Sequence, residues 1–181
     1  MDRKDFLKSL GLASGCMLLC NQRGIAAAGR PAGLNSEDEE MRRRFFEHWI
    51  VSLMENLEAN LKPEELTRLM EGCGRDCAHR SSVHKLAESC NGDVDILLSG
   101  LATFLGKNNC FRENDTVTLK YPKCYCEMVN KGPERLPDSY CLCSRGWVVE
   151  MFETAAQKPV QVELIKSVKR GDPHCEFTVR I

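Results

Sequence analysis

Apolar residues recur at helical spacing through the part of the chain that follows residue 36. From Glu37 to Leu61 they return every three or four positions, the pattern of an amphipathic helix whose apolar face lies on a core. We therefore predict one long helix over residues 37–61. Its expected core-facing residues are Met41, Phe45, Trp49, Leu53, Leu57 and Leu61.

Further helices are predicted from the same spacing. The second begins at Pro63, which the first turn of a helix tolerates, and its apolar face continues as far as Cys77. Shorter helices are expected over residues 83–90 and 93–107, separated by a helix-breaking Asn-Gly pair. These helices make up the N-terminal half of the predicted fold.

The pattern then changes to alternation, which indicates β-strands. Apolar and polar residues alternate over residues 117–121, 124–128, 160–164 and 175–181, and one more amphipathic helix is expected over residues 146–157. The chain is therefore predicted to have an α+β fold, in which an N-terminal helical half packs on a small C-terminal antiparallel sheet.

Composition narrows the class of protein and the partners. Hydrophobic residues make up 43% and charged residues 28% of the 181 residues, which is typical of a globular protein. The net charge of −1 provides no basic field for a phosphate backbone, so we expect a small molecule or a metal as the partner and no nucleic acid.

The first 28 residues have the pattern of an export signal. A basic start is followed by the apolar run Leu10–Cys20, which is too short to span a bilayer, and by the small residues Ala26–Ala28. Residues 3–8 also resemble the twin-arginine motif, with Lys4 where the second arginine normally stands. We expect no transmembrane segment in the mature protein.

These features predict where the chain is processed and where it acts. Cleavage after Ala28 fits the pattern better than lipidation of Cys16. The expected organisation is a signal peptide over residues 1–28, a linker over 29–40 and a single domain over 41–181. The predicted location is extracytoplasmic, for example the periplasm.

Cysteine is the unusual component, with eleven in the chain. Nine remain after the predicted signal peptide, an odd number that excludes complete intramolecular pairing. A disulfide within a Cys-x-Cys pair would also close a strained ring. The nine are Cys73, Cys77, Cys90, Cys110, Cys124, Cys126, Cys141, Cys143 and Cys175.

Two Cys-x-Cys pairs predict a metal site. Cys124 and Cys126 share one face of a predicted strand, and Cys141 with Cys143 follow after a loop rich in Gly and Pro. Four thiolates are typical ligands of structural zinc or of an iron–sulfur cluster. A mixture of buried thiols with one or two disulfides is the alternative.

Three other cysteines are possible additional ligands. Cys73 and Cys77 are four residues apart on a predicted helix, so their side chains point the same way and could hold one metal. The alternative is a pair of small buried residues, since free cysteine is commonly buried. Cys175 shares its strand face with Phe177 and is expected to point into the core.

Five segments carry a resemblance to a known family. They are residues 73–78, 123–129, 140–147, 160–164 and 170–177. Together they resemble a bacterial family named by similarity to L-2-amino-thiazoline-4-carboxylic acid hydrolase. The ending Gly-Asp-x-x-Cys-x-Phe is also similar to vinyl-reductase-type small-molecule-binding domains. The resemblance implies an α+β ligand-binding fold and a hydrolase acting on a small cyclic amidine or amide.

Three functional hypotheses follow. The first is a domain that binds a thiolate-held metal or a small ligand, the second is the hydrolase, and the third is a thiol-redox protein. The second, the hydrolase, needs a metal-bound water or a nucleophile such as Cys143, whose pKa a following helix N-terminus could lower. His79 and His84 are candidate bases, whereas strand alternation separates His174 from Cys175.

Overall fold

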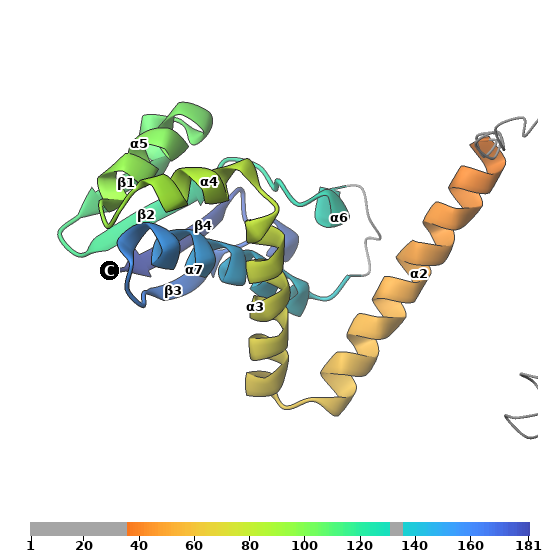
Figure 1. Ribbon diagram of the computed structural model, residues 1–181. Helices are drawn as coiled ribbons and strands as arrows, with labels where there is room; N and C mark the ends of the chain where they lie inside the picture. Colours follow the sequence, from red (N-terminus) through yellow and green to blue (C-terminus); the bar gives the residue numbers. More distant parts are fainter. Residues whose placement is uncertain (1–35, 131–135) are drawn as a thin grey trace, which may run out of the picture. The chain divides into compact units, whose positions relative to one another are not determined.

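The computed structural model describes residues 36–130 and 136–181 (Figure 1). The predicted signal peptide, with Cys16, lies outside these residues. Residues 41–181 form one compact unit. The first described helix already begins at Ser36, so the last five residues of the predicted linker are helical. No helix within the described ranges is both long enough and apolar enough to cross a membrane.

Helices dominate the first part of the described chain and a sheet occupies the second. The helices are α2 (Ser36–Asn60), α3 (Pro63–His79), α4 (Ser82–Ser89), α5 (Val94–Leu105), α6 (Glu127–Asn130) and α7 (Leu142–Ala156). The strands are β1 (Cys110–Glu113), β2 (Thr116–Tyr121), β3 (Gln161–Lys166) and β4 (Cys175–Arg180). Short 3-10 turns are η1 (Lys107–Asn109), η2 (Asp138–Cys141) and η3 (Val168–Arg170). The predicted α+β fold is confirmed.

The sheet is antiparallel throughout, with the strand order β1-β2-β4-β3. One face is apolar because every second residue of each strand points toward the helices. Figure 1 shows α4, α5 and α7 beside this sheet, and their apolar residues join its buried face in one core. The strand residues of that face are Cys110, Val117, Leu119, Val162, Cys175, Phe177 and Val179. Cys175 and Phe177 therefore both point into the core, as their alternation predicts.

A second, smaller core joins the two long helices. Val51 and Met54 of α2 pack with Leu66 and Met70 of α3, and Leu136 completes this cluster. The N-terminal half of α2 does not contribute, so the predicted core stripe is wrong there. Met41, Phe45 and Trp49 are 69%, 63% and 53% exposed. Helical periodicity reports which residues share a face, but only the C-terminal half of this face meets a partner among the described residues.

The predicted strand over residues 124–128 is also wrong. Residues 124–126 form a loop, and α6 follows directly. The chain turns here because the carbonyl of Cys126 accepts hydrogen bonds from the backbone N–H groups of Val129 (3.1 Å) and Asn130 (3.0 Å). The side-chain amide of Asn130 also donates to the carbonyl of Cys124. These local bonds take the place of a strand ladder.

Helix α7 crosses α3 at unusually short range, and two glycines permit it. A Cβ atom on Gly74 of α3 would lie 1.9 Å from the carbonyl oxygen of Cys143, at the start of α7. A Cβ atom on Gly146 of α7 would lie 2.1 Å from the carbonyl oxygen of Glu71 on α3. Both clashes involve backbone atoms, which cannot rotate away. The crossing therefore requires glycine at both positions.

The crossing predicts that Gly74→Ala destabilises the protein. The added methyl group must push the two helix backbones apart, which overpacks the contact and costs about 3 kcal/mol. Urea unfolding followed by circular dichroism measures the loss.

Gly72→Ala is the matched control, because Gly72 lies on the same helix with nothing within 4 Å of its Cβ position. Alanine should stabilise the exposed helix there by about 0.5–1 kcal/mol. Equal effects of the two substitutions would contradict a crossing that depends on Gly74.

Candidate functional site

Seven cysteines lie in one neighbourhood, which we call the cysteine cluster. The cluster draws on α3, the 124–126 loop, η2, the first turn of α7 and the start of β4. Its sulfurs lie near enough that the charge of one thiolate would raise the pKa of others, as those of Cys77 and Cys126 do for Cys143. Its members are Cys73, Cys77, Cys124, Cys126, Cys141, Cys143 and Cys175. The cysteines that the sequence predicted as ligands or additional ligands thus lie in one region of the fold.

Cys143 is central to this cluster because of the helix crossing. Its backbone lies against Gly74, which stands between Cys73 and Cys77 on α3. Burial, with a smaller contribution from the nearby Cys77 and Cys126, raises the pKa of the Cys143 thiol to about 12. Desolvation disfavours the charged thiolate, and several thiolates close together would repel one another.

Cys141 and Cys175 occupy the buried end of the cluster. The hydroxyl group of Ser167, itself fully buried, donates to the Sγ atom of Cys141 over 3.3 Å. The backbone N–H of Val168 donates to the Sγ atom of Cys175 over 3.4 Å. The segment from Ser167 to Val168 therefore orients both sulfurs through weak donors. Burial raises the pKa of Cys141, and the bond from Ser167 lowers it in part.

The two cysteines of the 124–126 loop, Cys124 and Cys126, are partly buried. Burial raises the pKa of Cys124, and the backbone N–H of Cys126 partly offsets this effect. The hydroxyl group of Tyr140 hydrogen-bonds to Cys126, and burial raises the pKa of Tyr140. A neutral phenol and neutral thiols can share a desolvated space at little electrostatic cost.

All nine cysteines of the described residues are free thiols. Cys90 and Cys110 are buried in the main core, apart from the cluster. Within the cluster the thiols are near neighbours but not yet at ligand spacing, since no three cysteine sulfurs of the described ranges lie within 4.8 Å of one another. A metal would have to draw the sulfurs closer.

The environment of Cys143 weighs against a role as a nucleophile in the metal-free protein. The structure places it inside the first turn of α7, because this helix begins at Leu142 rather than at residue 146 as predicted. An activated cysteine needs a lowered pKa, whereas burial raises this one to about 12. His174 is not paired with Cys175 but lies 3.0 Å from the carboxylate of Glu176, as strand alternation suggested.

The two candidate bases, His79 and His84, meet where α3 ends and α4 begins. His79 ends α3 and His84 lies in the first turn of α4, and their rings are 4.4 Å apart between centroids. The carboxylate of Glu150, on α7, lies 3.3 Å from His79 and 3.8 Å from His84. Sequence reasoning missed this grouping because Glu150 is remote in the chain. The two histidines flanking a short helix–helix turn were the one available signal.

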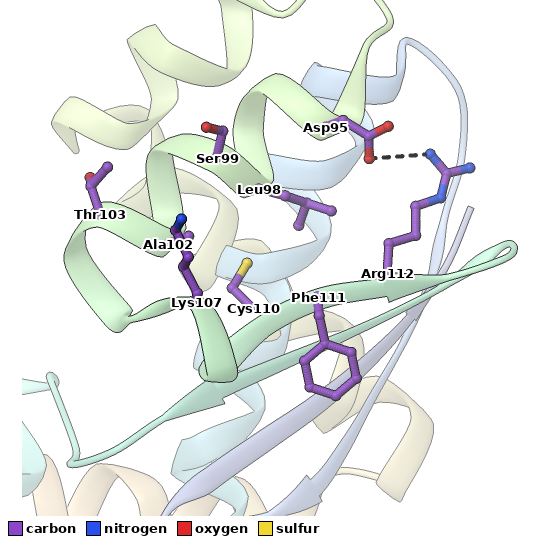
Figure 2. Close-up of a pocket in the computed structure, with 9 residues that line it drawn as sticks. All are labelled: Asp95, Leu98, Ser99, Ala102, Thr103, Lys107, Cys110, Phe111 and Arg112. Atoms are coloured by element: carbon purple, nitrogen blue, oxygen red, sulfur yellow. Dashed lines mark ion pairs between the residues drawn. The ribbon is translucent and has the colours of Figure 1, made fainter.

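A hollow elsewhere in the fold holds neither group. It lies between α5 and β1, and Figure 2 shows the ion pair of Arg112 and Asp95 across it, with 3.6 Å between nitrogen and oxygen. The sulfur of Cys110 points into the same space. Burial raises the pKa of Cys110 to about 11, so this thiol is not activated. The hollow is lined by Asp95, Leu98, Ser99, Ala102, Thr103, Lys107, Cys110, Phe111 and Arg112.

Comparison with known proteins gives a family but no activity. Residues 33–181 match a family of unknown function, DUF6144. No curated protein matches the sequence.

The burial pattern predicts unequal thiol reactivity in the metal-free protein. Cys73 and Cys77 are exposed, whereas Cys143 is part-buried with a pKa near 12. We expect iodoacetamide at about pH 7.5 to modify Cys143 at least tenfold more slowly than the exposed pair, because only the thiolate reacts. Peptide mapping by mass spectrometry measures the three rates. Faster modification of Cys143 would show an activated thiol and revive its nucleophilic role.

Proposed function

We propose that this chain, which belongs to the family of unknown function DUF6144, holds a soft metal ion or an iron–sulfur cluster in its cysteine cluster. Cys124, Cys126, Cys141 and Cys143 are the proposed ligands, and zinc is the simplest occupant. The observation that carries the proposal is the convergence of seven thiols from segments far apart in the chain.

Chemistry supports a metal over the other uses of sulfur. Thiolates select zinc, copper(I) and iron–sulfur clusters among biological metals. The core of this domain is large enough to need no staple, and none of the nine described cysteines forms a disulfide. Several buried thiols in one place stabilise little by themselves, because thiols are weak hydrogen-bond partners. A metal ion bound by all of them would explain why these cysteines lie together.

The proposed occupied state is tighter than the metal-free one. Four thiolates around tetrahedral zinc lie about 3.8 Å from one another, whereas no three cysteine sulfurs of the described residues lie within 4.8 Å of one another. The 124–126 loop is the segment best suited to move, since local hydrogen bonds rather than a sheet hold it. Cys141 and Cys143 are fixed by the turn and the helix that contain them.

Two other uses of the same residues stay hypotheses. The hydrolase acting on a cyclic amidine would need a metal-bound water in place of a free Cys143 thiolate, given the raised pKa of that thiol. The thiol-redox protein would need a reversible disulfide within the cluster. We also propose that the domain is exported, on the strength of the basic, apolar and alanine-rich segments of residues 1–28.

Cobalt(II) substitution tests the ligand set. Protein purified without oxygen and loaded with Co²⁺ should show the intense near-ultraviolet charge-transfer absorption of cobalt–thiolate bonds. Replacing Cys124 and Cys126 together by serine should remove most of this absorption. Cys90→Ser is the control, because Cys90 is buried outside the cluster and its sulfur donates to the carbonyl of Leu86, a bond that serine can keep. Full absorption in the double variant would exclude the loop pair as ligands.

Metal affinity should rise steeply with pH. Burial raises the pKa of Cys124, Cys141 and Cys143, so these thiols keep their protons in the metal-free protein, and a metal must displace them. Raising the pH lowers the cost of that displacement. Between about pH 6 and about pH 8 the Zn²⁺ affinity should increase by roughly tenfold per pH unit for each thiol deprotonated. Competition with a chromophoric chelator measures it, and a pH-independent affinity would contradict thiolate ligation.

A further inference from the structure

A second group of metal-ligating side chains lies where α3, α4 and α7 meet. One ligand atom each from His79, His84 and Glu150 lies within 4.8 Å of the other two. It is the one such group of three or more His, Cys, Asp or Glu residues found across residues 36–130 and 136–181. None of the three belongs to the cysteine cluster, and the oxygen and nitrogen donors differ from its sulfurs.

The spacing of the three donors approaches that of a metal site. Ligand atoms around tetrahedral zinc with bonds to nitrogen and oxygen lie about 3.3 Å apart. The Nε2 atom of His79 is 3.3 Å from the Oε1 atom of Glu150, and the Nε2 atom of His84 is 3.8 Å from the same oxygen. The donor atoms of the two histidines lie within 4.8 Å of each other, so rotation of the side chains would bring all three donors to ligand spacing.

His84 is held in the orientation that a ligand needs. Its Nδ1 atom lies 3.5 Å from the carboxylate of Glu88, one helical turn further along α4. A carboxylate at one ring nitrogen favours a proton there and leaves a lone pair on the other, which is the usual arrangement of metal-binding histidines. The Nε2 atom is buried and has no hydrogen-bond partner within the described residues. A buried acceptor without a partner is costly unless something binds it.

A neighbouring side chain also orients the carboxylate of Glu150. Its Oε2 atom accepts a hydrogen bond from Arg75 over 2.7 Å, and Arg75 also pairs with Glu153 at 2.8 Å. The Oε1 atom is left facing the two histidines, with a long hydrogen bond of 3.4 Å from the hydroxyl group of Thr154. The guanidinium group therefore orients the carboxylate without occupying the oxygen that would bind a metal.

Local charge favours a cation at this position. The carboxylate of Glu150 faces both histidines and that of Glu88 lies beside His84, while the single positive charge of Arg75 is shared between Glu150 and Glu153. The site is also accessible, because the side chain of His79 is 54% exposed while that of His84 is 12% exposed. A metal ion could thus enter from the side of His79 and rest against His84.

We propose that His79, His84 and Glu150 form a second metal site that binds Zn²⁺ through two imidazole nitrogens and one carboxylate oxygen. Three protein ligands leave the fourth tetrahedral position to a water molecule, the arrangement of zinc sites that act on substrates. Glu88 and Arg75 are positioning residues for this site. The proposal is independent of the cysteine cluster, since it uses other residues and other donor atoms.

Histidine NMR tests the site with internal controls. Zn²⁺ is added to the metal-free protein up to about three equivalents while the ring signals of all four histidines are followed. The signals of His79 and His84 should shift together to a bound position, and those of His48 and His174 should not. A parallel titration with Co²⁺, followed by the cobalt–thiolate absorption, reports the cysteine cluster alone and so separates the two sites, whichever fills first.

Two matched variants identify the carboxylate ligand. Glu150→Gln should weaken Zn²⁺ binding, as read from the NMR signals of His79 and His84, by at least about tenfold. Loss of a residue that only supports a metal ligand already lowers metal affinity by about that factor. Glu153→Gln also loses a partner of Arg75 but no metal donor, and should stay within about twofold of the parent protein. Equal losses in the two variants, or signals of His79 and His84 that do not move with Zn²⁺, would overturn the proposal.

Discussion

The close crossing of α3 and α7 is the contact on which the rest of this domain depends. Gly74 and Gly146 allow the two helix backbones to touch, and any larger residue at either position would meet a carbonyl oxygen near 2 Å. Ion pairs then hold the two helices in register, between Arg145 and Glu71 and between Arg75 and Glu150. Both ion pairs span the crossing that the two glycines permit.

Both candidate sites follow from this crossing. At one part of the contact, the start of α7 brings Cys143 against the stretch of α3 that carries Cys73 and Cys77. At another, Glu150 of α7 reaches the end of α3 and meets His79. The C-terminal half of α3 therefore contributes residues to both proposed sites. Separating the helices would disperse both.

The sequence predicted most of the helices and the fold class, because each leaves a local signal, whereas the cysteines as metal ligands stay a prediction. Strand alternation placed Cys175 in the core, and paired cysteines marked the cluster. Prediction from the sequence failed where contacts beyond the local pattern decide the structure. Local hydrogen bonds made residues 124–126 a loop, and the exposure of Trp49 depends on what α2 meets. No local pattern joins Glu150 to His84, so their grouping needed the fold.

The two proposed sites differ mainly in how far their donor atoms are already arranged to bind a metal, and less in the identity of those atoms. The histidine and carboxylate atoms already lie near ligand spacing, and Glu88 and Arg75 hold them there. The thiols lie further apart and keep their protons, because burial raises the pKa of Cys124, Cys141 and Cys143. At the proposed thiol site, a metal would have to supply the free energy that moves the loop and displaces the protons. At the proposed histidine site, a metal would meet the buried Nε2 atom of His84, which has no hydrogen-bond partner within the described residues. Metal binding at the thiols would therefore be coupled to a larger change in the protein than metal binding at the histidines.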